Sequence, residues 1–184
     1  MPTTKGRSRT AVSSLFLIQV MSSANKNLSV FSTENLPDSS QYRFAIVVAE
    51  WNEEVTEALY NGAYQTLLDN GAVAENIVRG NVPGSYELTT AAYWFAQRND
   101  IDAVIAIGCV IQGETKHNDY INHAVAQGLT TVSLKTNKPV IFGVLTPNTQ
   151  QQALDRAGGI HGNKGDEAAI TAIKMLKLMS ELAN

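Results

Sequence analysis

Three runs of apolar residues along the chain are continuous, without the alternation of polar and apolar positions that marks a half-exposed strand. They are FAIVVA at 44–49, DAVIAIGCV at 102–110 and PVIFGVL at 139–145. Continuous runs of this length are typical of strands that are covered on both faces of a parallel sheet. A further run, NIVRGNV at 76–82, is interrupted by polar residues, and we predict a strand there as well.

Between these runs, apolar residues recur every three or four positions, which is the period of a helix with one buried face. Glycines at 71 and 128 mark the ends of the first and third predicted helices. The five predicted helices cover residues 53–70, 86–98, 118–127, about 148–157 and about 164–182.

Strand and helix alternate four times with short connections, so the sheet is expected to be parallel with right-handed crossovers. The predicted fold class is α/β, a three-layer α/β/α sandwich of the flavodoxin-like type with a four-stranded parallel sheet. Ligands of such sheets bind beyond the carboxyl ends of the strands. The residues that follow each strand are therefore the candidates for a functional site.

The first 42 residues do not follow this pattern, and we expect a leader and extended arm over 1–42 and one domain over 43–184. Residues 1–27 contain no acidic residue, three early cations and a short apolar patch. This composition fits a signal or transit peptide, but we favour a leader upstream of an initiator at Met21. The stretch LSVF at 28–31 could add a strand to a neighbouring chain.

Charge and composition narrow the class of function. Residues 1–43 carry five basic and two acidic side chains, whereas residues 44–184 carry nine basic and fifteen acidic ones, which argues against a nucleic-acid surface. No apolar run approaches the roughly 20 residues that cross a bilayer. Cys109 is the single cysteine, and no Cys/His cluster has the spacing of a zinc site. We therefore expect a cytoplasmic protein that binds no nucleic acid, no membrane and no metal.

We call the residues that follow a predicted strand its exit. The exit of the first strand contains a tryptophan, and the exit of the second contains a tight turn. Trp51 either stacks on a flat heterocycle or covers the sheet edge. Pro83 and Gly84 form a turn that lets a ligand approach the backbone. Ser85 is expected to cap the next helix, and Glu87 lies in its first turn, where capping alone would explain it.

The third exit, IQGETKH at 111–117, places a histidine where a strand gives way to a helix. Thr115 is the expected N-cap, and the amides of residues 113–116 can converge on an anion at the helix start. His117 lies one turn before Ile121, so it is either a buried packing residue or a proton-transfer group beside a bound phosphate. The adjacent amides favour the second reading.

A glycine-rich stretch, RAGGIHGNKG at 156–165, follows the fourth helix. It is not a Walker A loop, because Gly165 follows Lys164 where that motif requires Ser or Thr. Arg156 and Lys164 have the chemistry to bind phosphate, one bidentately and one as a point charge. The same glycines would also fit the end of one helix and the start of the next.

Three further residues are interpreted as structural. We expect His123 and His161 to be surface or packing residues. Cys109 ends a buried strand, so its thiol is expected to be unreactive.

Together these motifs resemble the 6,7-dimethyl-8-ribityllumazine synthase family of riboflavin biosynthesis. The resemblance covers the chain from about residue 43 to its end, in the order WNEEVT, VPGSYEL, DAVIAIGCVIQGETKHNDYI, PVIFGVLT and QALDRAGGIHGNKGDEAAITAIKM. It implies a transferase that condenses 5-amino-6-(D-ribitylamino)uracil with 3,4-dihydroxy-2-butanone 4-phosphate. Phosphate and water are released, and neither a metal nor an organic cofactor takes part.

The resemblance also implies a role for individual residues, with His117 as the catalytic proton carrier. The residues that would bind phosphate are Gly113, Glu114, Thr115 and Arg156. Those that would meet the pyrimidine and its ribityl chain are Trp51, Ser85, Tyr86, Glu87, Val110, Ile111, Phe142, Lys164 and Glu167. Three positions depart from the common family pattern, namely Trp51 for phenylalanine, Gln112 for arginine and Asn118 for an aromatic residue.

Assembly is part of the same expectation. Family members form pentamers, decamers or sixty-subunit icosahedral capsids, with active sites between adjacent subunits, so a homopentamer is expected and the larger forms stay open. Riboflavin synthase is a possible further partner. Two other functions also stay open: a lumazine- or flavin-binding protein without catalysis, and an archaeal-type riboflavin synthase that consumes lumazine.

Overall fold

A four-stranded parallel sheet forms the middle layer of the protein in a computed structural model that describes residues 36–183. Its strands are β1 (Phe44–Ala49), β2 (Ile77–Val82), β3 (Ala103–Cys109) and β4 (Val140–Leu145), in the order β2-β1-β3-β4. The register aligns their ends, since Phe44 pairs with Ile77 and Ala103, and Val104 pairs with Val140. The carboxyl ends of the four strands therefore meet at one edge of the sheet.

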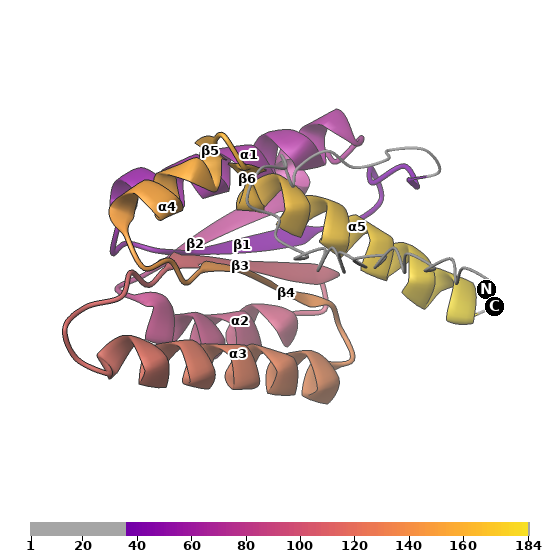
Figure 1. The fold of residues 1–184 in the computed structure, drawn as a ribbon. Coiled ribbons are helices and arrows are strands. Elements are labelled where there is room, and N and C mark those ends of the chain that lie inside the picture. The colour runs from indigo at the N-terminus through magenta and orange to yellow at the C-terminus, as the bar shows by residue number, and fades with distance from the viewer. Residues whose placement is uncertain (1–35, 184) are drawn as a thin grey trace, which may run out of the picture.

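Helices cover both faces of the sheet (Figure 1). The helices α1 (Glu53–Asp69), α4 (Gln150–Asp155) and α5 (Lys164–Leu182) lie on one face, and α2 (Leu88–Ala96) and α3 (His117–Thr136) lie on the other. Two short 3-10 turns, η1 (Ala74–Asn76) and η2 (Ser85–Glu87), flank β2. The predicted fold class, a three-layer sandwich around a four-stranded parallel sheet, is confirmed.

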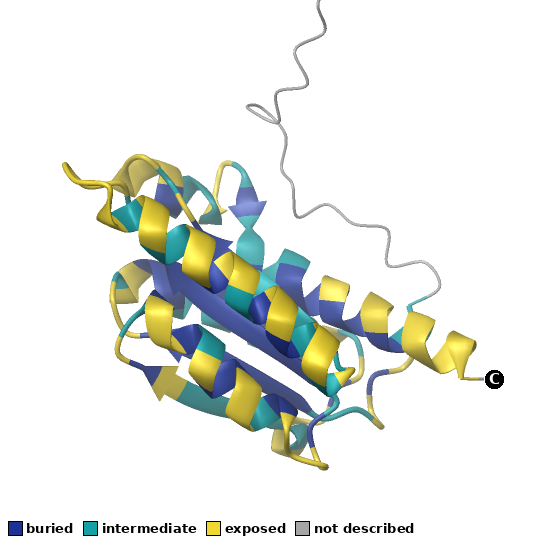
Figure 2. Ribbon diagram, turned by 90° about the horizontal axis from the view of Figure 1, so that it is seen from below, coloured by how far each residue is buried: buried dark blue, intermediate teal, exposed yellow. Residues whose placement is uncertain are grey.

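The continuous apolar runs are explained by two separate cores. Alternate residues of β1 enter different cores: Phe44, Ile46 and Val48 pack with α1 and α5, whereas the alanines at 45 and 49 and Val47 pack with α2 and α3. Every residue of β1 and β3 is buried. Figure 2 shows these buried strands between helices whose outer faces are exposed. A strand buried on both faces has no polar side, so its sequence shows no alternation.

The prediction that Gly128 ends the third helix is wrong. The helix α3 begins at His117 and continues through Gly128 to Thr136, and Asn137 ends it in the left-handed conformation (φ 52°). At Gly128 the helix contacts α2 so closely that an added Cβ would lie 2.6 Å from Cγ2 of Thr89. This position is therefore a glycine because two helices pack closely there. The prediction failed because a glycine after a helical pattern is also the usual sign of a helix end.

The glycine-rich stretch forms a small antiparallel hairpin, which we did not predict. Its strands are β5 (Ala157–Gly159) and β6 (Gly162–Asn163). Gly158 and Gly162 have φ of 107° and 81°, a region that side chains other than glycine rarely adopt. The hairpin carries the chain from α4 to the start of α5.

The predicted leader at 1–26 and the LSVF stretch lie outside the described residues, and the division of the chain at residue 42 stays a prediction. Residues 36–42 pack against the body, where Leu36 and Tyr42 contact the α1–α5 core. The amide of Ser39 donates to the carbonyl of Asn70 at 3.2 Å. No helix within 36–183 has both the length and the hydropathy to cross a membrane.

Candidate functional site at the carboxyl edge of the sheet

A cavity of about 370 Å³ opens at the carboxyl edge of the sheet, as the strand exits predicted. Pockets that hold small-molecule ligands have roughly 300–1,000 Å³. We call it the exit cavity. It is lined by Trp51, Asn52, Gly84, Ser85, Tyr86, Glu87, Cys109, Val110, Ile111, His117 and Ile121. The walls thus come from the exits of β1, β2 and β3 and from the first turns of α3.

Two exposed aromatic side chains stand at this cavity. Trp51 is 73% exposed and Tyr86 is 58% exposed, so neither contributes to the core. A Cβ added to Gly84 would lie 3.4 Å from Trp51 and 3.2 Å from the carboxylate of Glu87. The glycine therefore leaves room for both side chains to lie close to the turn. An exposed indole at the mouth of a cavity is suited to stack on a flat ring.

Ser85 does not cap the following helix, contrary to the prediction. The residue at the N-cap of α2 is Glu87, and no side chain caps either α2 or η2. Ser85 is buried instead, and a Cβ added to Gly108 would lie 2.7 Å from its Oγ. The absence of a side chain at Gly108 lets the VPGSYE turn pack directly on β3, which brings its backbone to the cavity wall.

The loop between β3 and α3 is anchored at its base and open at its tip. Amides of Val110 and Gln112 donate to the carbonyls of Leu145 and Pro147, both at 2.9 Å. Residues 113–115 are exposed, and a Cβ added to Gly113 would meet no atom within 4 Å. The predicted N-cap was wrong by one position, because the N-cap is Lys116 and no side chain caps the helix. The loop thus presents its backbone to solvent at the start of a long helix, where the macrodipole favours an anion.

His117 is the first residue of α3 and is exposed, so the reading as a buried packing residue is wrong. Its amide donates to Oγ1 of Thr115 at 3.4 Å, which ties the histidine backbone to the loop. Its side chain lines the exit cavity. The histidine therefore lies between the cavity and the loop with the exposed backbone.

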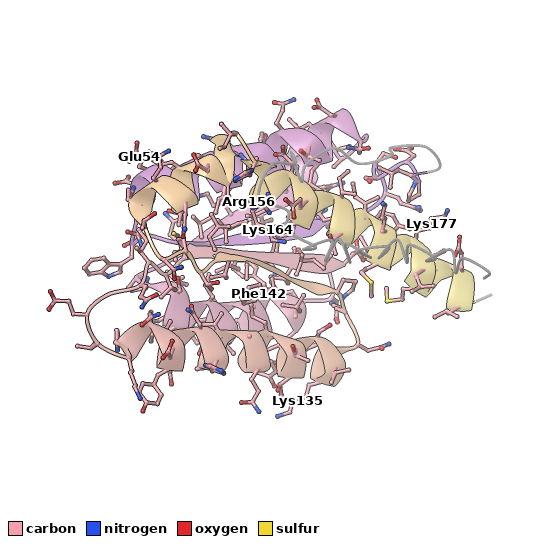
Figure 3. The ribbon with its side chains drawn as sticks, viewed as in Figure 1. Glu54, Lys135, Phe142, Arg156, Lys164 and Lys177 are labelled. Carbon is pink, nitrogen blue, oxygen red and sulfur yellow. The ribbon has the colours of Figure 1, made fainter. Side chains whose placement is uncertain are left out.

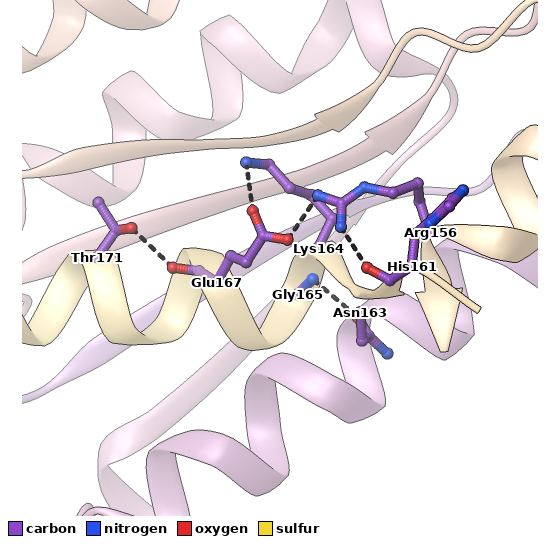
Figure 4. A network of polar contacts seen from close by, with 7 residues as sticks. All are labelled: Arg156, His161, Asn163, Lys164, Gly165, Glu167 and Thr171. Carbon is purple, nitrogen blue, oxygen red and sulfur yellow. Dashed lines mark hydrogen bonds and ion pairs between the residues drawn. The ribbon is translucent and has the colours of Figure 1, made fainter. Parts of the chain in front are cut away.

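Three of the remaining predicted residues, Arg156, Lys164 and Glu167, form a second group, shown in Figure 4. Glu167 accepts from Arg156 Nη2 at 2.5 Å through one carboxylate oxygen and from Lys164 Nζ at 3.1 Å through the other. Arg156 Nη1 also donates to the carbonyl of His161 at 2.7 Å. The Arg156 and Glu167 side chains are only 18% and 16% exposed, so their charge-assisted contact is partly shielded from water.

Phe142 and Lys164 line a different cavity, of about 360 Å³, beside β4. Figure 3 shows them on opposite sides of this edge strand, with Phe142 toward α2 and α3 and Lys164 on the side of α5. We call Phe142, Arg156, Lys164 and Glu167 the edge cluster. None of its members lines the exit cavity. Within one chain, the edge cluster is therefore a separate group from the predicted residues that line the exit cavity.

Asn52 is a lining residue that we did not predict. The sequence did indicate that it lies in a turn, because asparagine is a typical turn residue between a buried strand and a helix whose first residues are acidic. Cys109 and Ile121 also line the cavity. The sequence indicated only that Cys109 is buried and that Ile121 fits the spacing of a helix.

Cys109 is expected to resist alkylation at neutral pH. It is 2% exposed, and burial raises the pKa of its thiol to about 11 from 9.0. Because the folded-state pKa is the higher one, the folded protein holds this proton more tightly, and stability should fall as pH rises from about 9 to about 11. Mass spectrometry after iodoacetamide treatment should find native protein unlabelled and urea-unfolded protein labelled. Equal labelling of both samples would contradict the burial of this thiol.

Comparison with known proteins gives a consistent result. A family model described as 6,7-dimethyl-8-ribityllumazine synthase matches residues 41–180. The protein of that name from Cytophaga hutchinsonii is 62% identical over 156 residues, which cover 85% of this chain and 98% of the relative. The protein of that name from Flavobacterium johnsoniae is 54% identical, over 84% of this chain and 82% of the relative. The one from Porphyromonas gingivalis is 51% identical, over 86% of this chain and 98% of the relative.

Proposed function

The chain belongs to the 6,7-dimethyl-8-ribityllumazine synthase family, and from this premise we propose how its residues divide the work of the reaction. It is a transferase of riboflavin biosynthesis. It condenses 5-amino-6-(D-ribitylamino)uracil with 3,4-dihydroxy-2-butanone 4-phosphate and releases phosphate and water. The observation that carries the assignment of residues is that His117 lies between the exit cavity and the exposed loop at residues 113–115.

The pyrimidine occupies the exit cavity in this proposal. Its flat ring stacks on the indole of Trp51, which is exposed at the cavity. The VPGSYE turn, with Ser85, Tyr86 and Glu87, and the backbone at Val110 and Ile111 bind the polar edge and the ribityl chain. These contacts are suited to a polyhydroxylated ligand because turn backbone and carboxylate supply both donors and acceptors.

The phosphate of the second substrate binds to the amides of Gly113, Glu114 and Thr115 in this proposal. The start of α3 supports this, because the side chain of its N-cap residue, Lys116, caps no amide and the macrodipole at a helix N-terminus favours an anion. His117 then moves protons twice. It helps the carbinolamine lose water when the imine forms, and it takes a proton from carbon when phosphate leaves.

A neighbouring copy of the chain completes the site in this proposal. The edge cluster supplies Arg156 to the phosphate and Phe142, Lys164 and Glu167 to the pyrimidine and its ribityl chain, but in a single chain none of them lines the exit cavity. A contact between the exit cavity of one copy and the edge cluster of the next is head-to-tail, and head-to-tail contacts form a ring when the rotation from one copy to the next closes on itself. We propose a pentamer. The decamer, the capsid, an association with riboflavin synthase and a cytoplasmic location stay predictions.

Arg156→Ala is expected to raise the KM for the phosphorylated substrate roughly 10- to 100-fold, because a hydrogen bond to a charged group contributes about 1.5–3 kcal/mol. The KM for the pyrimidine should change little. Steady-state kinetics with each substrate varied in turn measure both. Arg98→Ala is the matched control, since Arg98 forms an exposed pair with Asp100. An unchanged KM for the phosphorylated substrate would contradict the role of Arg156.

The reaction itself is tested by incubating the protein with both substrates and following lumazine fluorescence and inorganic phosphate together. The two products should rise in step above the uncatalysed background. Binding of lumazine without turnover would support a binding protein instead, and consumption of lumazine would support a riboflavin synthase.

A further inference from the structure

Asn52 joins two walls of the exit cavity in a way that the proposed chemistry does not use. It follows Trp51 in the turn between β1 and α1, and its φ and ψ are 60° and 47°, in the left-handed region. Among residues 36–183, only Asn52 and Asn137 are non-glycine residues with positive φ. Asparagine tolerates this region better than most side chains, but the conformation still requires support from the surroundings.

The side chain of Asn52 supplies that support across the sheet edge. Its Nδ2 donates to the carbonyl of Cys109, the last residue of β3, at 2.8 Å. The registered pairs between β1 and β3 end at Val48 and Ile107, so this hydrogen bond lies beyond the end of the ladder. It therefore connects the exits of β1 and β3 beyond their last registered pair.

The backbone of Asn52 is held as well. Its carbonyl accepts from the amides of Val55 at 2.9 Å and Thr56 at 3.0 Å, which starts α1. The residue is thus fixed to α1 by its backbone and to β3 by its side chain. Trp51 immediately precedes it, and Val110 and Ile111 immediately follow the acceptor residue Cys109.

We propose that Asn52 is a positioning residue that sets the separation between Trp51 and the Val110–Ile111 wall to fit the flat pyrimidine substrate. The proposal rests on the proposed function, in which the ring stacks on Trp51 while the backbone at Val110 and Ile111 binds its polar edge and the ribityl chain. Without the hydrogen bond, the turn that carries Trp51 is tied to β3 only through the sheet below it. The indole then samples other positions, and binding of the flat ring weakens while proton transfer at His117 is unaffected.

Three substitutions separate the backbone conformation from the hydrogen bond. Asn52→Gly keeps a residue suited to positive φ and removes the donor. Asn52→Asp keeps the size of the side chain and replaces the amide donor with carboxylate oxygens, which only accept when ionised. Asn52→Ala removes the donor and also strains the backbone. Asn137→Gly is the matched control, because Asn137 has the same conformation at the far end of α3.

The test is steady-state kinetics together with the emission of Trp51, recorded in a Trp94→Phe background because Trp94 is also exposed. Asn52→Gly and Asn52→Asp should raise the KM for the pyrimidine roughly three- to tenfold, the effect of one hydrogen bond. Their kcat and their KM for the phosphorylated substrate should stay at the wild-type value. The Trp51 emission maximum and anisotropy of the unliganded protein should change in both variants and not in Asn137→Gly.

Two outcomes would overturn the positioning role. One is an Asn52→Gly variant with unchanged pyrimidine KM and unchanged Trp51 emission. The other is a variant in which kcat falls and the pyrimidine KM does not change, which would place the asparagine in the chemistry itself. A wild-type protein without turnover would instead overturn the proposed function, and the Trp51 emission would still decide whether Asn52 positions the indole.

Discussion

Replacing His117 by alanine is expected to lower kcat by roughly 10²–10⁴-fold, the usual contribution of one proton-transfer group. The fold should not change, because the side chain is exposed at the first position of α3 and its removal leaves no cavity in either core. Binding of the pyrimidine should be nearly unchanged, since stacking on Trp51 does not involve the imidazole. Stopped-flow measurement of lumazine formation, with thermal denaturation alongside, separates the effect on turnover from any effect on stability.

His123→Ala is the control for this result. His123 lies on the same helix and is also exposed, and its Nδ1 contacts the carbonyl of Asp119 at 2.6 Å. It does not line the exit cavity. We expect this variant to keep wild-type turnover. If both histidine variants had equal kcat, the role of His117 as proton carrier would be wrong.

The second large effect concerns Gly165, where alanine is expected to destabilise the protein by roughly 3 kcal/mol or more. A Cβ at this position would lie 1.9 Å from the carbonyl oxygen of Leu59 and 2.8 Å from its carbonyl carbon. Both atoms belong to the backbone of α1, so no side chain can rotate away and α5 must move. Overpacking of a core usually costs about 1–3 kcal/mol, and contact with backbone places this site at the upper end.

The same junction explains why this variant should also lose activity. Asn163 donates to the carbonyl of Ala58 at 2.9 Å and accepts from the amide of Gly165 at 2.8 Å, which fixes the start of α5 on α1. A displaced α5 would carry Lys164 and Glu167 away from Arg156.

Scanning calorimetry should show a fall of roughly 6–12 °C in the melting temperature of Gly165→Ala, at about 2–4 °C for each kcal/mol in a chain of this size. Gly113→Ala is the comparison, because a Cβ there meets nothing within 4 Å and its melting temperature should match the wild type. Equal melting temperatures for the two variants would contradict the close approach of α1 and α5.

Most of the fold followed from the sequence because the two cores impose a simple pattern. Strands buried on both faces, such as β1 and β3, must be apolar throughout, and a helix with one buried face repeats every three or four residues. Glycine was harder to interpret. Gly128 and Gly108 are glycines because another element packs on them, at Thr89 and Ser85. The sequence does not show which element packs on a glycine. A glycine that is needed for close packing therefore cannot be distinguished in the sequence from one that ends a helix.

The candidate site was predictable to a similar degree and for a related reason. Parallel strands end at one edge, so the residues after β1, β2 and β3 had to lie together, and they do. Asn52 was missed because its importance comes from a hydrogen bond to Cys109, which is 57 positions away along the chain. The separation between the exit cavity and the edge cluster likewise depends on three-dimensional distance, which the spacing of RAGGIHGNKG does not encode.

Complementation between two impaired variants tests the two-copy site most directly. Chains with His117→Ala and chains with Arg156→Ala are expressed together with different affinity tags, purified on both tags and assayed with the phosphorylated substrate well below its KM. In a mixed ring, an intact histidine meets an intact arginine of the neighbour at about one site in four. We therefore predict recovery of about a quarter of wild-type activity in the mixture, far above either variant alone. Activity no higher than the mean of the two variants would show that His117 and Arg156 act within one chain or not in the same site.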